Sequence, residues 1–266
     1  MPSPYIAAPG AKFELAERPT RVKIYKNKKA AQDAIKDNAK AISGLAHRLY
    51  GEADRKLLIV LQGMDTSGKD GTTSAIFHRT PPLNVKVASF KSPTKTELAH
   101  DYLWRVHNVI PGKGQITVFN RSHYEDVLVV KVKNYVDAKT IGQRYQQIND
   151  FERLLVESGT TVLKFMLHIS YETQGERLRD RLVNPDKRWK FNPGDLDDRA
   201  LWPDFMDAYE TMVQNTSTKY APWHIIPSDS RKTRGAIISE IVRETLEKMN
   251  PQYPDPGYRP EQFEID

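Results

Sequence analysis

A short apolar run that leads into a glycine-rich loop narrows the choice of fold more than any other part of the sequence. Residues 57–61 read LLIVL, residues 63–69 read GMDTSGK, and a helical pattern follows at once. This is the spacing G-x-x-x-x-G-K in the strand, loop and helix setting that the motif requires. The glycines let the loop wrap with its N–H groups pointing inward, while the helix N-terminus and Lys69 add positive charge. The sequence therefore predicts a site for an anion of two or more linked phosphates.

The loop departs from the common pattern at one position. Asp70 stands directly after the lysine, where Ser or Thr normally gives a hydroxyl to magnesium. A carboxylate can hold the same metal. We therefore expect the metal to be retained despite the substitution.

The rest of the chain alternates between short apolar runs rich in β-branched residues and longer segments with helical spacing. Such alternation is typical of βα units, and most of the runs are too continuously apolar for a sheet with one wet face. We expect an α/β fold, doubly wound, with helices on both faces of a parallel sheet. The expected strands are Leu57–Leu61, Val85–Phe90, Ile116–Phe119, Val162–Ile169 and His224–Ile226, and the expected helices are 29–50, 69–78, 95–109, 138–158, 172–182, 201–217 and 232–249.

Proline-rich segments flank this pattern. Residues 1–28 and residues 250–266 each hold four prolines and show no helical or strand periodicity. We expect them to form an N-terminal and a C-terminal arm around one domain, residues 29–249, in which no internal repeat is apparent. The aromatic residues of the arms and the long helix at 138–158 favour a homo-oligomer.

Composition limits the choice of partner and compartment. The 266 residues carry 40 Lys and Arg against 34 Asp and Glu, a formal charge of +6 that favours anionic partners. There is no cysteine, which excludes a disulfide framework, a thiolate nucleophile and a cysteine metal site. No apolar run approaches the roughly 20 residues of a membrane helix, and no basic segment followed by an apolar stretch opens the chain. We expect a cytoplasmic protein that does not enter a membrane.

A second polar group follows the third expected strand, where residues 120–126 read NRSHYED. P-loop proteins usually place an acidic residue facing the metal at the end of such a strand, and here Asn120 takes that position. The acidic role then falls to Asp65, Asp70, Glu125 and Asp126. Glu125 or Asp126 alone could instead simply begin a helix, since carboxylates favour first turns.

Arg121 follows Asn120 directly, where it could bridge a donor and an acceptor phosphate. The segment 91–94, KSPT, should border the same crevice because it follows the second expected strand. We expect it to touch a nucleotide. Thr94 and Glu97 also have the spacing of a capping box, which would begin the next helix.

The third polar group is rich in arginine and lysine. Residues 176–190 contain six Lys or Arg and three acidic residues. Small phosphoryl-transfer kinases keep a closing lid in this part of the chain, and its cations stabilise charge on the transferred group. We expect a lid at about 172–200, and the alternative is a solvated helix face, which a run of charges often forms.

The segments GMDTSGKDG, FNRSHYEDVL and RLVNPDKRWKF, in this order and with these separations, strongly resemble the polyphosphate kinase 2 family over roughly residues 30–250. The resemblance implies a thymidylate-kinase-like fold: a P-loop kinase-like three-layer sandwich with a five-stranded parallel sheet and a helical lid. It implies Mg²⁺-dependent, reversible phosphoryl transfer between inorganic polyphosphate and a nucleotide, with Mn²⁺ as a substitute metal. The combination of Asn120 with Glu125 and Asp126 resembles the third class of the family, which accepts both AMP and ADP. Whether guanine nucleotides are also accepted stays open.

The resemblance also implies a working set of residues. The expected catalytic group is Asp65, Lys69, Asp70, Arg121 and Glu125, with Asp65 and Asp70 holding the metal. The residues expected to bind nucleotide or polyphosphate are Gly63, Thr66, Ser67, Gly68, Gly71, Thr72, Lys91, Asn120, Asp126, Arg177, Arg181, Lys187, Arg188 and Lys190.

Two other functions compete with this interpretation. An ATP-dependent nucleoside monophosphate kinase would use the same fold with ATP as the donor. A basic nucleic-acid-binding protein would also be cationic, but here the positive charges gather in the expected lid rather than along an aromatic platform, and no helix-turn-helix or RNA-recognition signature is apparent. We therefore expect polyphosphate and nucleotides as partners, and no nucleic acid.

Overall fold

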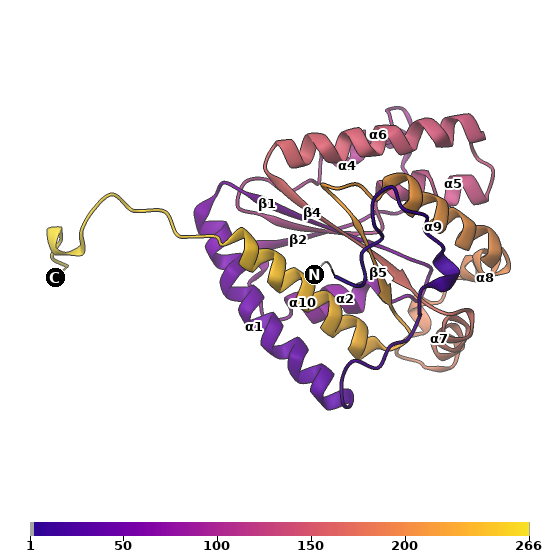
Figure 1. Cartoon of the computed structure of the whole chain (residues 1–266), viewed down its shortest axis with the longest axis horizontal. Coiled ribbons are helices and arrows are strands. Elements are labelled where there is room, and N and C mark those ends of the chain that lie inside the picture. Colours follow the sequence, from indigo (N-terminus) through magenta and orange to yellow (C-terminus); the bar gives the residue numbers. More distant parts are fainter. Residues whose placement is uncertain (1–2, 266) are drawn as a thin grey trace.

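Five parallel strands form one sheet in the order β2-β3-β1-β4-β5 in the computed structural model, which describes residues 3–265 (Figure 1). Leu61 at the end of β1 lies opposite Asn120 of β3, and Gln62 lies opposite Met166 of β4, so the carboxyl ends of the three central strands meet at one edge. The strands are β1 Lys56–Gln62, β2 Val85–Ser89, β3 Ile116–Asn120, β4 Thr160–His168 and β5 Trp223–Pro227.

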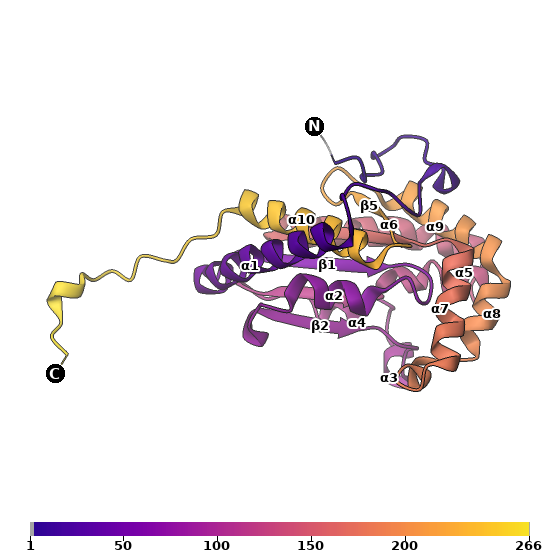
Figure 2. The ribbon, with the colours of Figure 1, turned by 90° about the horizontal axis from the view of Figure 1, so that it is seen from below.

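Helices cover both faces of the sheet (Figures 1 and 2). Along β1, Leu57 and Ile59 join the apolar cluster on one face, and Leu58 and Val60 join the cluster on the other. The predicted three-layer α/β fold is confirmed. The first face is covered by α1 Lys28–Glu52, α2 Lys69–Phe77 and α10 Arg231–Met249, and the second by α6 Ala138–Glu157 and α9 Trp202–Thr216.

The helix expected at 95–109 is wrong as a single element. The chain forms two short helices there, α3 Lys95–Leu98 and α4 Trp104–His107. Thr94 and Glu97 form the expected capping box at the start of α3. Between the two helices the side chain of Asp101 accepts a hydrogen bond from the N–H of Leu103 at 2.9 Å, a local bond of the kind that competes with helical hydrogen bonds.

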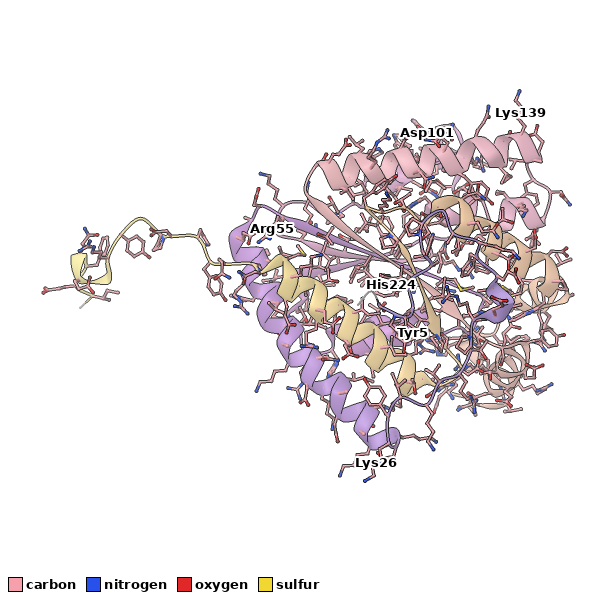
Figure 3. All side chains as sticks on the ribbon, viewed as in Figure 1. Tyr5, Lys26, Arg55, Asp101, Lys139 and His224 are labelled. Carbon is pink, nitrogen blue, oxygen red and sulfur yellow. The ribbon has the colours of Figure 1, made fainter. Side chains whose placement is uncertain are left out.

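The N-terminal segment is more ordered than an arm rich in proline suggests. Ile6 pairs antiparallel with His224 on the edge of β5, and the N–H of Ile225 donates to the carbonyl of Tyr5 at 2.7 Å. Figure 3 shows Tyr5 and His224 close together over the sheet. Phe13 and Leu15 are buried in the core, so this segment protects one edge of the sheet.

The opposite edge of the sheet, formed by β2, is exposed. In β2 the side chains of Lys86, Val87 and Ser89 are exposed, and 52% of Val87 is accessible to solvent.

The chain after α10 leads away from the body as an extended tail (Figures 1 and 2).

A fully buried ion pair joins the second helical layer to the sheet. The ammonium of Lys164 in β4 donates to Glu152 of α6 at 2.6 Å, to the hydroxyl of Tyr124 at 2.9 Å and to the carbonyl of Thr216 at 2.7 Å. Tyr124 in turn donates to Glu152 at 2.7 Å. These bonds anchor the turn after β3, which carries Arg121, to the core.

Within the described residues, no helix is both long enough and apolar enough to cross a membrane. Three further helices lie at the carboxyl edge of the sheet or near it: α5 Val129–Val132, α7 Tyr171–Val183 and α8 Gly194–Ala200.

Candidate active site

The loop after β1 has the backbone of a phosphate cradle. Gly63 has φ +147°, and a Cβ there would lie 2.7 Å from the carbonyl of Leu167 in β4, so only glycine fits. Lys69 at the start of α2 folds back over the loop and donates to the carbonyls of Gly63 at 2.7 Å and Met64 at 3.3 Å. Burial and the cation of Arg121 lower the pKa of Lys69 to about 8. A bound phosphate would supply a negative charge beside Lys69 and so favour its charged form.

Arg121 lies at the point where β3 meets the loop. Its φ of +60° is unusual for a residue other than glycine, and its guanidinium lies 2.5 Å from Asp65 and 3.7 Å from Glu125. Burial opposes the charge on Arg121, but the Glu125 and Asp65 carboxylates outweigh it and raise its pKa. Burial likewise opposes ionisation of Asp65, but Lys69 and Arg121 hold its pKa below the usual value. The pKa of Glu125 is raised because burial outweighs its cationic neighbours.

Asp70 links the loop, the sheet and the lid. It accepts hydrogen bonds from the amide of Asn120 at 2.7 Å and from the ammonium of Lys190 at 3.2 Å. Burial opposes ionisation of Asp70, but the bonds from Asn120 and Lys190 prevail and lower its pKa. The lid therefore contacts the phosphate loop directly.

The lid consists of α7, α8 and the turn between them. Arg181 donates to Asp195 at 3.0 Å, and Lys187 to Asp180 at 2.6 Å, so these two cations have acidic neighbours inside the lid. Burial and the nearby charge of Asp65 raise the pKa of Asp195 to about 6. Arg188 donates to the carbonyl of Leu182.

Loop, strand ends and lid surround one cavity of about 780 Å³. Its walls carry a large excess of cations, contributed by elements far apart in sequence. Of the residues singled out in the sequence, the cavity is lined by Asp65, Thr66, Gly68, Lys69, Asp70, Gly71, Lys91, Asn120, Arg121, Arg177, Arg181, Lys187 and Lys190.

Six of the expected residues do not line this cavity: Gly63, Ser67, Thr72, Glu125, Asp126 and Arg188. Gly63, Ser67 and Thr72 shape the loop from the side that faces away from the cavity. Glu125 reaches the cavity only through Arg121. Asp126 lies instead beside a separate cavity of about 250 Å³, where Arg105 and Arg144 are 3.6 and 3.8 Å from its carboxylate.

Arg234 was missed by the sequence reasoning. It lies buried in α10 and donates to the carbonyls of Ser67 at 2.8 Å and Ser228 at 3.2 Å and to the hydroxyl of Thr72 at 2.9 Å. It therefore braces the phosphate loop and lines the cavity. Its position on the same helix face as Ile237 and Ile238 was the available signal, since a charge among core residues needs a partner.

Among the residues that the structure describes, no group of three or more His, Asp or Glu could hold a metal ion by itself. The carboxylates that face the cavity are Asp65 and Asp70 from the loop, and Asp180 and Asp186 from the lid. Mg²⁺ commonly binds through one or two carboxylates together with substrate phosphates, so a small acidic set of this kind fits the metal.

A phosphate loop under a cationic lid, at the carboxyl edge of a parallel sheet, is the arrangement of enzymes that move phosphoryl groups. Fold and site together define a P-loop kinase. Comparison with known proteins narrows this class: the family described as Polyphosphate kinase 2 (PPK2) matches residues 25–254. The chain belongs to the polyphosphate kinase 2 family.

Individual relatives agree with this assignment. The chain is 47% identical over 264 residues to the AMP/ADP-polyphosphate phosphotransferase of Meiothermus ruber, covering 98% of this chain and 99% of the relative. It is 36% identical to the ADP-polyphosphate phosphotransferase of Rhodopseudomonas palustris, covering 92% and 90%. The crystal structure of Polyphosphate Kinase 2 from Arthrobacter aurescens TC1 superimposes with a TM-score of 0.92 at 36% identity, covering 95% of this chain and 92% of that one.

Proposed function

We propose that this chain is a polyphosphate:AMP/ADP phosphotransferase, which reversibly transfers a phosphoryl group from inorganic polyphosphate to AMP and to ADP. The observation that carries the proposal is the cavity of about 780 Å³ in which the phosphate loop faces cations from the lid and from α10. Such a cavity suits two polyanions at once. The names of the Meiothermus ruber and Rhodopseudomonas palustris relatives support polyphosphate as donor and adenine nucleotides as acceptors.

The roles follow from what phosphoryl transfer requires. The attacking group is already a phosphate oxygen, so little base catalysis is needed, and positioning and charge neutralisation supply most of the rate. Lys69 neutralises the outer phosphates in the loop. Arg121 is held between Asp65 and Glu125, and its proposed role is to bridge the donor and acceptor phosphates. Arg181, Lys187 and Lys190 close over the transferred group from the lid.

Magnesium is part of the proposal. Asp65 and Asp70 would hold the ion together with phosphate oxygens, and the ion would neutralise charge on the transferring group. Asp70 now accepts bonds from Asn120 and Lys190, so substrate binding would exchange the lysine contact for the metal. Mn²⁺, which prefers similar oxygen ligands, is expected to substitute.

The proposal includes a cytoplasmic location, supported by the absence of cysteine from the sequence. It also includes a homo-oligomeric assembly, supported by the exposed aromatic side chains of the C-terminal segment, Tyr253, Tyr258 and Phe263.

The experiment is an incubation of the purified protein with Mg²⁺, long-chain polyphosphate and, separately, AMP, ADP or GMP, with no ATP added. We expect ADP and ATP from AMP, and ATP from ADP, by chromatography. ATP from ADP alone would retain the family and reject the dual acceptor range, while product from GMP would extend that range to guanine. If product required added ATP as donor, a nucleoside monophosphate kinase would replace the proposal. Omitting Mg²⁺ should abolish transfer, and Mn²⁺ should restore it.

A further inference from the structure

Three side chains in the turn after β3 have no part in the proposed chemistry: Ser122, His123 and Tyr124. All three are fully buried and none of them lines the cavity, so they cannot touch a substrate there. They follow Arg121 directly, and the backbone of Arg121 is unusual. Its φ of +60° lies in the left-handed region, which a residue with a side chain occupies only where the surrounding structure holds it.

The sheet fixes the backbone on the N-terminal side of Arg121. The N–H of Arg121 donates to the carbonyl of Leu61 in β1 at 3.1 Å, and the carbonyl of Asn120 accepts from the N–H of Phe90 at 3.1 Å. These two bonds determine where the chain leaves the sheet. They do not determine the direction in which it turns after Arg121.

Ser122 holds the backbone on the other side. Its Oγ accepts hydrogen bonds from the side-chain amide of Gln62, at the end of β1, at 3.3 Å and from the N–H of Tyr124 at 3.2 Å. The carbonyl of Ser122 accepts from the N–H of Glu125 at 3.1 Å. Ser122 therefore ties the turn to β1 and begins the short helical turn His123–Asp126 that carries Glu125.

Tyr124 ties the same turn to the second helical layer. Its hydroxyl donates to Glu152 of α6 at 2.7 Å and accepts from Lys164 of β4 at 2.9 Å, and all three side chains are fully buried. Its ring packs against the rings of His123 and Trp223, with centroids 4.6 and 4.8 Å away. Because hydrogen bonds to charged groups are stronger than neutral ones, the hydroxyl holds the turn more firmly than ring packing alone would.

These contacts set the position of the Arg121 guanidinium. With its backbone held on both sides, the guanidinium lies 2.5 Å from Asp65 and 3.7 Å from Glu125, in the wall of the cavity. On a less constrained turn, Arg121 would relax out of the left-handed region and carry its charge away from these carboxylates. Electrostatic stabilisation of a transition state requires charges that are already in place, and small displacements are costly.

We propose that Ser122 and Tyr124 are positioning residues for phosphoryl transfer, which act through Arg121 by holding its backbone in the left-handed conformation. This inference rests on the proposed function, because it needs the role given there to Arg121. It goes beyond that function by assigning a task to residues that the substrates do not touch. A positioning residue acts on the transition state more than on substrate binding, so kcat should fall while KM stays close to the wild-type value.

The test removes one hydroxyl and keeps the rest of the side chain. In Tyr124→Phe the ring can still pack, and Glu152 keeps its bond from Lys164 at 2.6 Å, so the fold should persist. With AMP and polyphosphate as substrates we expect kcat to fall about tenfold, the cost of a modest displacement of a catalytic group, and both KM values to stay within about twofold. Ser122→Ala should show the same pattern.

The matched control is Tyr145→Phe. Tyr145 is buried in the same apolar cluster as Tyr124, and within residues 3–265 its hydroxyl has no hydrogen-bond partner. This variant removes the same atom from the same kind of surroundings and should keep the kcat and the thermal melt of the wild type. An equal loss of kcat in Tyr145→Phe and Tyr124→Phe would overturn the proposal.

The decisive comparison repeats Tyr124→Phe in an Arg121→Ala background. If Tyr124 acts only through the side chain of Arg121, its hydroxyl no longer matters once that side chain is gone, and kcat should change by less than about twofold. An equal loss in both backgrounds, or wild-type kcat in Tyr124→Phe, would overturn the proposal and leave the proposed function intact. Wild-type protein that used no polyphosphate would overturn the proposed function, and the same cycle with ATP as donor would still decide whether the turn positions Arg121.

Discussion

Phosphate binding in the loop depends most directly on Lys69. The carbonyls of Gly63 and Met64 hold its ammonium in place before any phosphate arrives. Replacing Lys69 with Ala should lower kcat about 100- to 1,000-fold, the usual cost of losing one preorganised group that stabilises transition-state charge. The thermal melt should be nearly unchanged, since a buried charge is removed. Lys190→Ala, which leaves the loop intact, should cost less. Near-normal turnover by Lys69→Ala would contradict the loop assignment.

His224 should make the fold sensitive to acid. It is 5% exposed, and burial lowers the pKa of its imidazole to about 4 from 6.5. Between pH 6.5 and pH 4 the unfolded chain therefore binds more protons than the folded one, and the free energy of unfolding falls as the pH falls, by up to about 3 kcal/mol. Urea unfolding at pH 7.5 and pH 4.5 should show a smaller loss in His224→Gln than in the wild type. Equal losses in the two proteins would exclude His224 as the cause.

At the scale of elements, the buried pair of Glu152 in α6 and Lys164 in β4 should matter for stability. Glu152→Gln leaves a buried ammonium without its counter-charge, which typically costs about 3–5 kcal/mol. The double variant Glu152→Leu, Lys164→Met removes both charges and should recover much of the loss. Urea unfolding of the wild type, of Glu152→Leu, of Lys164→Met and of the double variant measures the coupling between the two side chains.

An exposed pair serves as the comparison. Lys113 and Asp54 lie 3.1 Å apart with side chains 68% and 69% accessible, and Asp54→Asn should cost less than about 1 kcal/mol. If Glu152→Gln were as mild as Asp54→Asn, the buried pair would not be holding α6 to the sheet.

Some of the elements could be predicted from the sequence, and others could not. The strand expected at Val162–Ile169 is β4, Thr160–His168, because continuous apolar runs are a local signal. At the break in the helix expected at 95–109, the side chain of Asp101 accepts a local hydrogen bond from the N–H of Leu103, and such a bond has no periodic signature. The burial of Phe13 and Leu15 requires the surface of the folded core, which no local pattern describes.

The residues of the candidate site likewise include some that the sequence predicts and some that it does not. The loop and the lid could be found because their residues are contiguous in sequence, as in GMDTSGKD. Arg234 could not, because it acts on Ser67 from a helix more than 160 residues away, a contact that the sheet order alone creates. The position of Asp126 beside a separate cavity likewise depends on Arg105 and Arg144, which approach from other elements.

At the scale of the whole molecule, the C-terminal tail bears on assembly. Tyr253 still packs on the body, where its hydroxyl lies 2.8 Å from Nδ1 of His47. Beyond it the chain leads away (Figure 1), and the rings of Tyr258 and Phe263 contact each other at 5.3 Å while 55% and 61% exposed. Exposed aromatic surface of this kind is stabilised when another surface covers it. A second copy of the chain is the partner that we expect.

Light scattering after gel filtration should therefore give the full chain a mass that is a multiple of 30.5 kDa. A chain that ends at Pro256 keeps the contact of Tyr253 with His47 but loses both exposed rings, and it should give a smaller assembly. The full-length variant Tyr258→Ser, Phe263→Ser should behave like the shortened chain, because the loss is of apolar surface rather than of length. A wild type of monomer mass would contradict the homo-oligomer, and an unchanged mass in both variants would place its interface elsewhere on the molecule.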